Sequence, residues 1–172
     1  QLDVVAALNE ELAPFRILTG IECDINVDGS LDQTDELLGR LDVVVASVHS
    51  ELRAPAAQMT ARMLTAVANP HTDVLGHCTG RLIIGRRQRN GEQKPRPEST
   101  FDAEAVFAAC AEFGTAVEIN SRPERLDPPR RLLTLANELG CEFSIDTDAH
   151  AVAQATSSNA PLWLQLTSGP AG

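Results

Sequence analysis

Acidic and imidazole side chains that could bind a metal ion recur along this chain, each at or just past the end of a short apolar segment. These candidate ligands are Glu22, His49, His77, Asp148 and His150. Imidazoles and carboxylates without paired thiolates suit Zn²⁺, Mn²⁺ or Fe²⁺ in a site with open coordination positions, rather than a structural zinc finger. Such an ion lowers the pKa of a bound water and orients it. The residue types therefore predict a hydrolytic metal site, with Glu22, His49, His77 and Asp148 as its catalytic residues.

The segments that carry these side chains are predicted to be strands of one parallel sheet. The predicted strands are Phe15–Cys23, Asp42–Val48, Thr72–Gly76, Thr115–Ile119 and Cys141–Ile145. Helical spacing of apolar residues predicts helices between them, over residues 2–12, 34–40, 57–68, 101–113 and 128–139. We expect Ser99 and Asp127 to cap the last two helices. This regular alternation predicts an α/β fold in which the strand ends meet on one face and gather the site.

Each candidate also has a plainer interpretation. A single histidine at a strand end is more often a hydrogen-bonding core residue than a ligand, so the metal-site prediction depends on the whole set. Glu118 and Asp146 are ambiguous, because either could support a ligand or simply fill the space between strands. His71 follows Pro70 at a strand entrance and is predicted to lie on the surface.

Two arginines are predicted to bind a substrate phosphate. Arg81 stands four residues after His77 and Arg122 two residues after Asn120, so both lie on loops near the predicted site. A salt bridge to one of the 24 acidic residues is the alternative for each. Residues 79–100 hold six of the 14 lysines and arginines and are predicted to form a polar, solvated loop.

Bulk composition narrows the classes of function. The net charge of −10 over 172 residues argues against a stand-alone nucleic-acid binder, since phosphate neutralisation supplies most of that affinity. The sequence shows no apolar run long enough to cross a bilayer and no signal peptide at Gln1. The four cysteines lack C-x-x-C spacing, which predicts free, mostly buried thiols in a reducing compartment. We therefore expect a cytoplasmic protein that does not bind membranes.

Several strings, in their order and spacing, resemble the PHP (polymerase and histidinol phosphatase) family. The likeness is strongest to the branch associated with bacterial family X DNA polymerases and stand-alone PHP phosphoesterases, and it covers roughly residues 1–151. The strings are Gly20-Ile-Glu-Cys-Asp-Ile, Asp28-Gly-Ser-Leu-Asp, Val45-Ala-Ser-Val-His-Ser, Met59-Thr-Ala-Arg, Asn69-Pro-His-Thr-Asp-Val-Leu-Gly-His-Cys-Thr-Gly-Arg-Leu, Val117-Glu-Ile-Asn and Asp146-Thr-Asp-Ala-His.

This resemblance implies a distorted, TIM-like (β/α)7 barrel with two or three Zn, Mn or Fe ions. It implies hydrolysis of phosphate esters in small molecules or at nucleic-acid 3′ ends. Carried over by motif, Glu22 is a bridging carboxylate, His49 and His77 are imidazole ligands, and Asp148 with His150 is the last ligand pair.

The chain also departs from the family pattern. It has no His-x-His motif, and five predicted strands stand where the family has seven. We therefore expect an incomplete barrel over residues 1–151, with fewer metal ions and lower activity, followed by an atypical, disordered tail over 152–172. Open sheet edges at residues 15–23 and 141–145 favour self-association.

Two alternatives remain at this point. An amidohydrolase is disfavoured because one common version of that site uses a bridging lysine, and Lys94, the only lysine, lies in the polar loop. The second alternative is a non-catalytic, degenerate PHP module associated with a DNA polymerase or repair partner. For an active enzyme, the acidic composition favours a small phosphorylated molecule over DNA as substrate.

Overall fold

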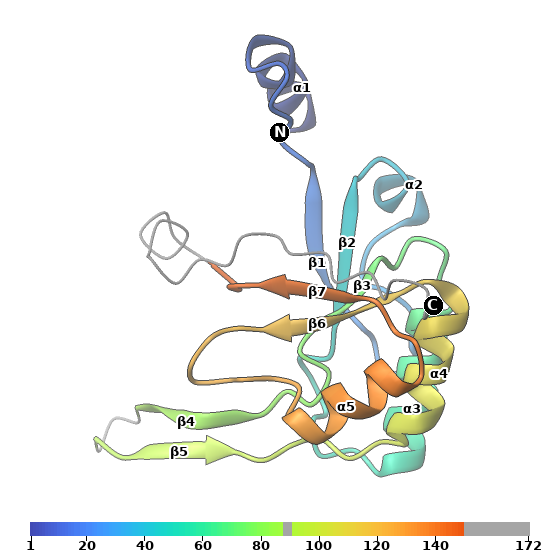
Figure 1. The fold of residues 1–172 in the computed structure, drawn as a ribbon, viewed down its shortest axis with the longest axis vertical. Coiled ribbons are helices and arrows are strands. Elements are labelled where there is room, and N and C mark those ends of the chain that lie inside the picture. The colour runs from blue at the N-terminus through green and yellow to red at the C-terminus, as the bar shows by residue number, and fades with distance from the viewer. Residues whose placement is uncertain (88–90, 150–172) are drawn as a thin grey trace, which may run out of the picture.

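A five-stranded parallel sheet forms the centre of the computed structural model, which describes residues 1–87 and 91–149 (Figure 1). In sheet order the strands are β1 (Gly20–Asp24), β2 (Val43–Ser47), β3 (Val74–Leu75), β6 (Ala116–Asn120) and β7 (Phe143–Asp146). Each overlaps one predicted segment, and every neighbouring pair is parallel. The α/β class and the five parallel strands are therefore confirmed.

Five helices alternate with these strands, as the apolar spacing predicts. They are α1 (Leu2–Glu11), α2 (Asp35–Leu38), α3 (Ala56–Val67), α4 (Ala103–Phe113) and α5 (Arg130–Glu138). Helix α4 packs between α3 and α5, and together these three helices lie on one side of the sheet (Figure 1). Helix α1 buries no residue and projects beyond the start of β1 (Figure 1).

The core lies between α3, α4 and the central strands. Met59 and Met63 of α3, Phe107 of α4, Leu75 of β3 and Val117 of β6 are all fully buried. Burial of these large apolar side chains is the main term that holds the helices on the sheet. All four cysteines are free and buried, which confirms the prediction for the thiols.

The register of the sheet places the ends of the strands at one edge. Asp24 pairs with Ser47 at the ends of β1 and β2, and Asn120 pairs with Asp146 at the ends of β6 and β7. The chain therefore leaves neighbouring strands at the same level of the sheet. Loops that carry polar side chains begin there.

The polar segment over residues 79–100 is not simply a loop, so that prediction is wrong. It contains an antiparallel pair, β4 (Leu82–Arg87) and β5 (Gln93–Arg96), which extends away from the parallel sheet (Figure 1). Gly85 permits this pairing, because a Cβ atom there would lie 1.9 Å from the Lys94 carbonyl oxygen. The prediction of a loop followed from the many charged residues of the segment. It overlooked a short apolar run with high β propensity that begins at Leu82.

The predicted caps of α4 and α5 are also wrong. Asp102, rather than Ser99, caps α4, with its Oδ1 accepting from the Ala105 backbone N–H at 3.1 Å. Asp127 does not cap α5 because Pro129 disfavours helical geometry at Pro128, so the helix begins only at Arg130. Asp127 is instead fully buried and accepts from the Thr79 N–H at 3.2 Å.

The strand predicted over residues 15–23 begins later than expected. Phe15 is 66% exposed, and the ladder with β2 starts at Gly20. Just before it, the Asp42 carboxylate accepts from both the Thr19 N–H and the Thr19 hydroxyl at 2.8 Å. The side chain of Asp42 thus fixes the point at which the two strands meet.

Strands β1 and β7 are the two edges of the described sheet. Self-association through these edges stays a prediction. Within the described ranges, no helix is both long and apolar enough to cross a membrane. The tail predicted over residues 152–172 lies outside the described residues.

Truncating Phe107 tests the position of the core. We expect Phe107→Ala to lower the free energy of unfolding by about 3–5 kcal/mol, because it removes a fully buried ring from α4. Phe113→Ala is the matched control on the same helix, since Phe113 is 54% exposed, and it should cost less than about 1 kcal/mol. Urea unfolding followed by circular dichroism measures both. Equal midpoints for the two variants would contradict this description of the core.

Candidate metal centre

Three neighbouring strands position the centre. Glu22 and Asp24 are two residues apart on β1, so both side chains lie on the same face of the sheet. His49 comes two residues after the end of β2, and His77 two residues after the end of β3. Because β1, β2 and β3 are parallel neighbours, these side chains reach the same edge of the sheet.

Glu22, His49 and His77 come together in space. The His49 Nε2 atom lies 3.1 Å from the His77 Nε2 atom and 3.3 Å from the Glu22 Oε1 atom. Each of the three residues offers a ligand atom within 4.8 Å of the others. His77 is 3% exposed, whereas Glu22 and His49 open to solvent. The cluster therefore has a buried floor and an accessible side.

Each imidazole has a carboxylate behind it. His49 Nδ1 lies 2.5 Å from Asp24 Oδ1, and His77 Nδ1 lies 3.3 Å from Glu118 Oε2. A carboxylate at Nδ1 favours a proton on that nitrogen and leaves the lone pair on Nε2. Two such lone pairs at 3.1 Å repel unless a proton or a cation lies between them. The geometry thus favours a positive charge at the centre of the cluster.

The pKa shifts follow from these contacts. The hydrogen bond with His49 lowers the pKa of Glu22 to about 2. Hydrogen bonds to Glu22 and Asp24 raise the pKa of His49 to about 9 despite its partial burial. Burial lowers the pKa of His77 to about 4. At neutral pH without a metal, the proton therefore resides on His49, and His77 is a neutral acceptor.

Backbone geometry keeps the third strand close to the other two. A Cβ atom at Gly76 would lie 2.1 Å from the Ser47 hydroxyl oxygen. That hydroxyl is 3.4 Å from His77 Nδ1, so it belongs to the wall of the cluster. A side chain at position 76 would therefore have to displace the Ser47 hydroxyl from the wall of the cluster.

Buried acids support His77 from behind. Glu118 is 4% exposed, accepts from the His77 backbone N–H, and accepts from Asn120 Nδ2 at 3.2 Å. Burial raises the pKa of Glu118, and burial together with the neighbouring Glu118 raises the pKa of Asp146 to about 8. The two carboxyl groups therefore favour sharing a proton over carrying two negative charges. Of the two roles that the sequence left open for Glu118, the structure therefore fits support of the candidate ligand His77.

Asp148 lies beside this cluster rather than in it. Its Oδ2 atom is 3.3 Å from Arg122 Nη1, 3.3 Å from Arg125 Nε and 3.3 Å from Asn120 Nδ2. Asn120 and Glu118 link it to His77. Over residues 1–87 and 91–149, the structure groups only Glu22, His49 and His77 as possible ligands of one ion. His150 lies outside the described residues, so its role as a ligand stays a prediction.

The two arginines predicted to bind phosphate have protein partners. Arg81 donates to the backbone carbonyls of Arg125 and Leu126 and lies 3.4 Å from Glu98. Arg122 Nη2 lies 2.6 Å from Glu124 Oε1, and its Nη1 reaches Asp148. Both arginines therefore form salt bridges with acidic residues in this structure, which is the alternative that the sequence analysis gave for them. Their binding of phosphate stays a prediction.

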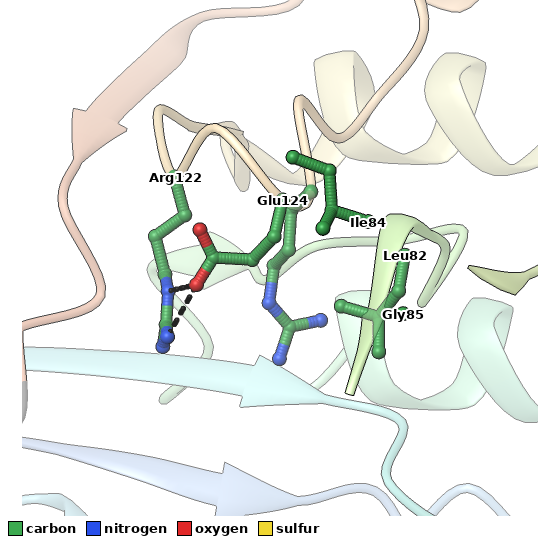
Figure 2. A pocket seen from close by; sticks show the side chains of 6 residues that line it. Leu82, Ile84, Gly85, Arg122 and Glu124 are labelled. Atoms are coloured by element: carbon green, nitrogen blue, oxygen red, sulfur yellow. Dashed lines mark hydrogen bonds and ion pairs between the residues drawn. The ribbon is translucent and has the colours of Figure 1, made fainter. Parts of the chain in front are cut away.

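A pocket of about 280 Å³ adjoins Arg122. Figure 2 shows the Arg122–Glu124 pair on one side of it and the aliphatic side chains of Leu82 and Ile84 on the other. Arg125 also lines it. The sequence reasoning missed this arginine, which has no distinguishing motif.

Asp24 is the other residue that sequence reasoning missed. The sequence could have indicated Asp24, because a residue two positions after Glu22 on the same strand lies on the same face of the sheet. His71, predicted to be on the surface, is partly buried and lies outside the cluster.

The fold and cluster define an α/β protein with a candidate metal centre at the ends of parallel strands. No family model matches the chain. It is 40% identical over 152 residues to the DNA polymerase/3'-5' exonuclease PolX of Bacillus subtilis, covering 88% of this chain and 25% of that protein. It is 28% identical over 153 residues to a "probable phosphatase" of Caldanaerobacter subterraneus, covering 82% and 53% of the two chains. A "probable phosphatase" of Shewanella sp. (strain ANA-3) is 31% identical over 143 residues, covering 78% and 50%.

This chain is therefore a homologue of PolX and of probable phosphatases. It spans about a quarter of the length of PolX and about half the length of these phosphatases.

Removing Asp24 should lower the pKa of His49. In protein treated with a chelator, we expect His49 to titrate near pH 9 and Asp24→Asn to move that pKa partway toward 6.5, since Glu22 and Asp24 both stabilise the imidazolium and the variant retains Glu22. Because folding raises this pKa, the stability that His49 contributes is full below about pH 6.5 and is lost as the pH rises through 9. Histidine NMR titration measures the shift. Asp28→Asn, which removes an exposed carboxylate that bonds Ser30, is the control. A wild-type pKa near 6.5 would contradict the geometry.

Proposed function

We propose that this chain is a metal-dependent phosphoesterase of the PHP type, with Glu22, His49 and His77 as ligands of a divalent ion. The observation that carries the proposal is the pair of Nε2 atoms 3.1 Å apart, each on an imidazole with a carboxylate at Nδ1. Adjacent ligand atoms around a tetrahedral Zn²⁺ are about 3.3–3.6 Å apart when its bonds are about 2.0–2.2 Å. The His49–Glu22 separation of 3.3 Å lies at the lower end of this range, and the His49–His77 separation of 3.1 Å is slightly below it.

Charge supports the same proposal. Glu22 is ionised and His77 is neutral at pH 7, so both already have the protonation state that a ligand needs. Only His49 must release a proton, from the nitrogen that faces His77. Asp24 and Glu118 then hold the two rings in orientation through Nδ1, as carboxylates do behind metal-bound histidines.

When bound, the ion would activate a water molecule and neutralise charge on the scissile phosphate ester. Zn, Mn and Fe all suit two imidazoles and a carboxylate, and the number of ions is part of the proposal. Asp148 and His150 are proposed as further ligands. Arg122 is better placed than Arg81 to meet a phosphate, since it contacts Asp148 beside the cluster, whereas the Arg81 guanidinium donates to the backbone at Arg125 and Leu126 and lines a different pocket.

The proposed substrates are phosphate esters, either small molecules or nucleic-acid 3′ ends. The names of the relatives support both, because one is a 3'-5' exonuclease and others are probable phosphatases. We propose that the five-stranded sheet is part of a (β/α)7 PHP-type barrel. Lower turnover than that of a longer relative stays a prediction.

A non-catalytic module associated with a polymerase is the second candidate. The 40% sequence identity to PolX favours this candidate. The position of Asp148 favours it too, because Asp148 pairs with two arginines and does not join Glu22, His49 and His77. Metal content separates it from the enzyme. A folded chain that binds no metal would support the module.

Replacing His77 should abolish metal binding and hydrolysis together. We expect purified protein to hold at least one Zn, Mn or Fe ion per chain, and His77→Ala to lower both metal affinity and turnover of p-nitrophenyl phosphate by about 100-fold or more, since ligand loss exceeds the cost of losing a supporting group. His71→Ala is the matched control because His71 lies outside the cluster. Elemental analysis and phosphate release measure the two properties. Hydrolysis that survives in the metal-free variant would refute the proposal.

A further inference from the structure

Arg62 is a buried guanidinium that the proposed chemistry does not use. It lies on α3, is 2% exposed, and is the one lysine or arginine among the buried side chains of the described residues. Burying a charge in a core is costly unless every donor finds a partner. The position therefore needs a reason beyond packing.

The donors of Arg62 all go to neutral oxygen atoms in two loops. Nε donates to the carbonyls of Ile25 and Asn26, at 3.1 and 2.8 Å, and Nη2 also donates to the Ile25 carbonyl. Nη1 donates to the Ser50 carbonyl at 2.8 Å, and Nη2 to the Ser50 hydroxyl at 3.1 Å. No carboxylate within the described ranges forms an ion pair with this guanidinium. Its bonds instead fix the path of the backbone.

These two loops adjoin residues of the candidate metal centre. Ile25 directly follows Asp24, and Ser50 directly follows His49. The β1–β2 ladder ends where the Ile25 N–H donates to the Ser47 carbonyl at 2.8 Å, so His49 lies beyond the last ladder bond. Past that point, the planar fork of Arg62 joins the two loops.

We propose that Arg62 is a positioning residue that sets the distance between the β1 carboxylates and His49, and so sets the affinity of the centre for its metal. This inference depends on the proposed metal site for its effect on affinity, while the effect on His49 can be measured without metal. Lysine cannot replace Arg62, because a single ammonium group cannot reach both loops in the geometry of the fork. A purely structural role would instead change stability alone.

A neighbouring core residue separates the two roles. Met63 is the next residue on α3 and is fully buried, so Met63→Ala destabilises the same helix and leaves the five donor contacts in place. We expect Arg62→Lys to weaken Mn²⁺ or Zn²⁺ affinity by 10- to 100-fold, the usual effect of losing a group that orients ligands. Met63→Ala should change that affinity less than twofold although it lowers the unfolding midpoint.

The experiment measures metal affinity by competition with a chelating dye, using the full 172-residue chain. In parallel, NOE spectra of the metal-free protein detect the contact between the rings of His49 and His77, whose centroids are 5.0 Å apart. We expect Arg62→Lys to weaken this NOE and Met63→Ala to retain it. If wild-type protein binds no metal, the proposed function fails, and the NOE still tests Arg62.

Ser50→Ala keeps the experiment decisive if Arg62→Lys does not fold. It leaves α3 intact and removes the hydroxyl that accepts from Nη2, so we expect a smaller loss of affinity, about two- to fivefold, and a weaker NOE. Wild-type affinity and an unchanged NOE in the folded variants would overturn the proposal. Equal losses in Arg62→Lys and Met63→Ala would overturn it too, because stability alone would then explain the effect.

Discussion

The parallel, in-register pairing of β1, β2 and β3 is the constraint on which the rest of the structure depends. It brings Glu22, His49 and His77 to one edge, although they are far apart in the sequence. A one-residue slip of β1 would turn Glu22 and Asp24 to the opposite face. Such a slip would also break the Asp42–Thr19 bond at the start of the ladder and the Arg62 bonds to the two loops beyond its end. Register and chemistry are therefore specified by the same contacts.

Electrostatics at the centre follows from that constraint. Carboxylate oxygens and a neutral imidazole nitrogen surround a space in which a positive charge is favourable. In the metal-free protein, the protonated His49 ring supplies this charge. Burial keeps His77 neutral, since the cost of desolvation exceeds its attraction to Glu22. In the proposed function, a metal ion would compete with a proton for His49 Nε2.

Local patterns in the sequence predict the strands and helices, because apolar periodicity reflects which side of an element is buried. They also predict the meeting of Glu22, His49 and His77, since parallel strands end at one edge. The same reasoning does not find the β4–β5 pair, because the apolar run of β4 is only three residues long, from Leu82 to Ile84, and charged residues surround it. The Arg62 bonds and the Asp148–Arg125 contact depend on tertiary geometry, which periodicity does not encode.

The place of Asp148 shows how charge divides the strand-end face into two parts. On the β1–β3 side, imidazoles face one another and attract a cation. On the β6–β7 side, Arg122 and Arg125 already neutralise Asp148, whose side chain is 8% exposed and would be costly to bury unpaired. An ion at the proposed site near His77 would therefore compete with two guanidinium groups for this carboxylate. Asp148 therefore links the two parts of this face, because Asn120 connects it to Glu118 behind His77 while its carboxylate contacts the two arginines that line the pocket.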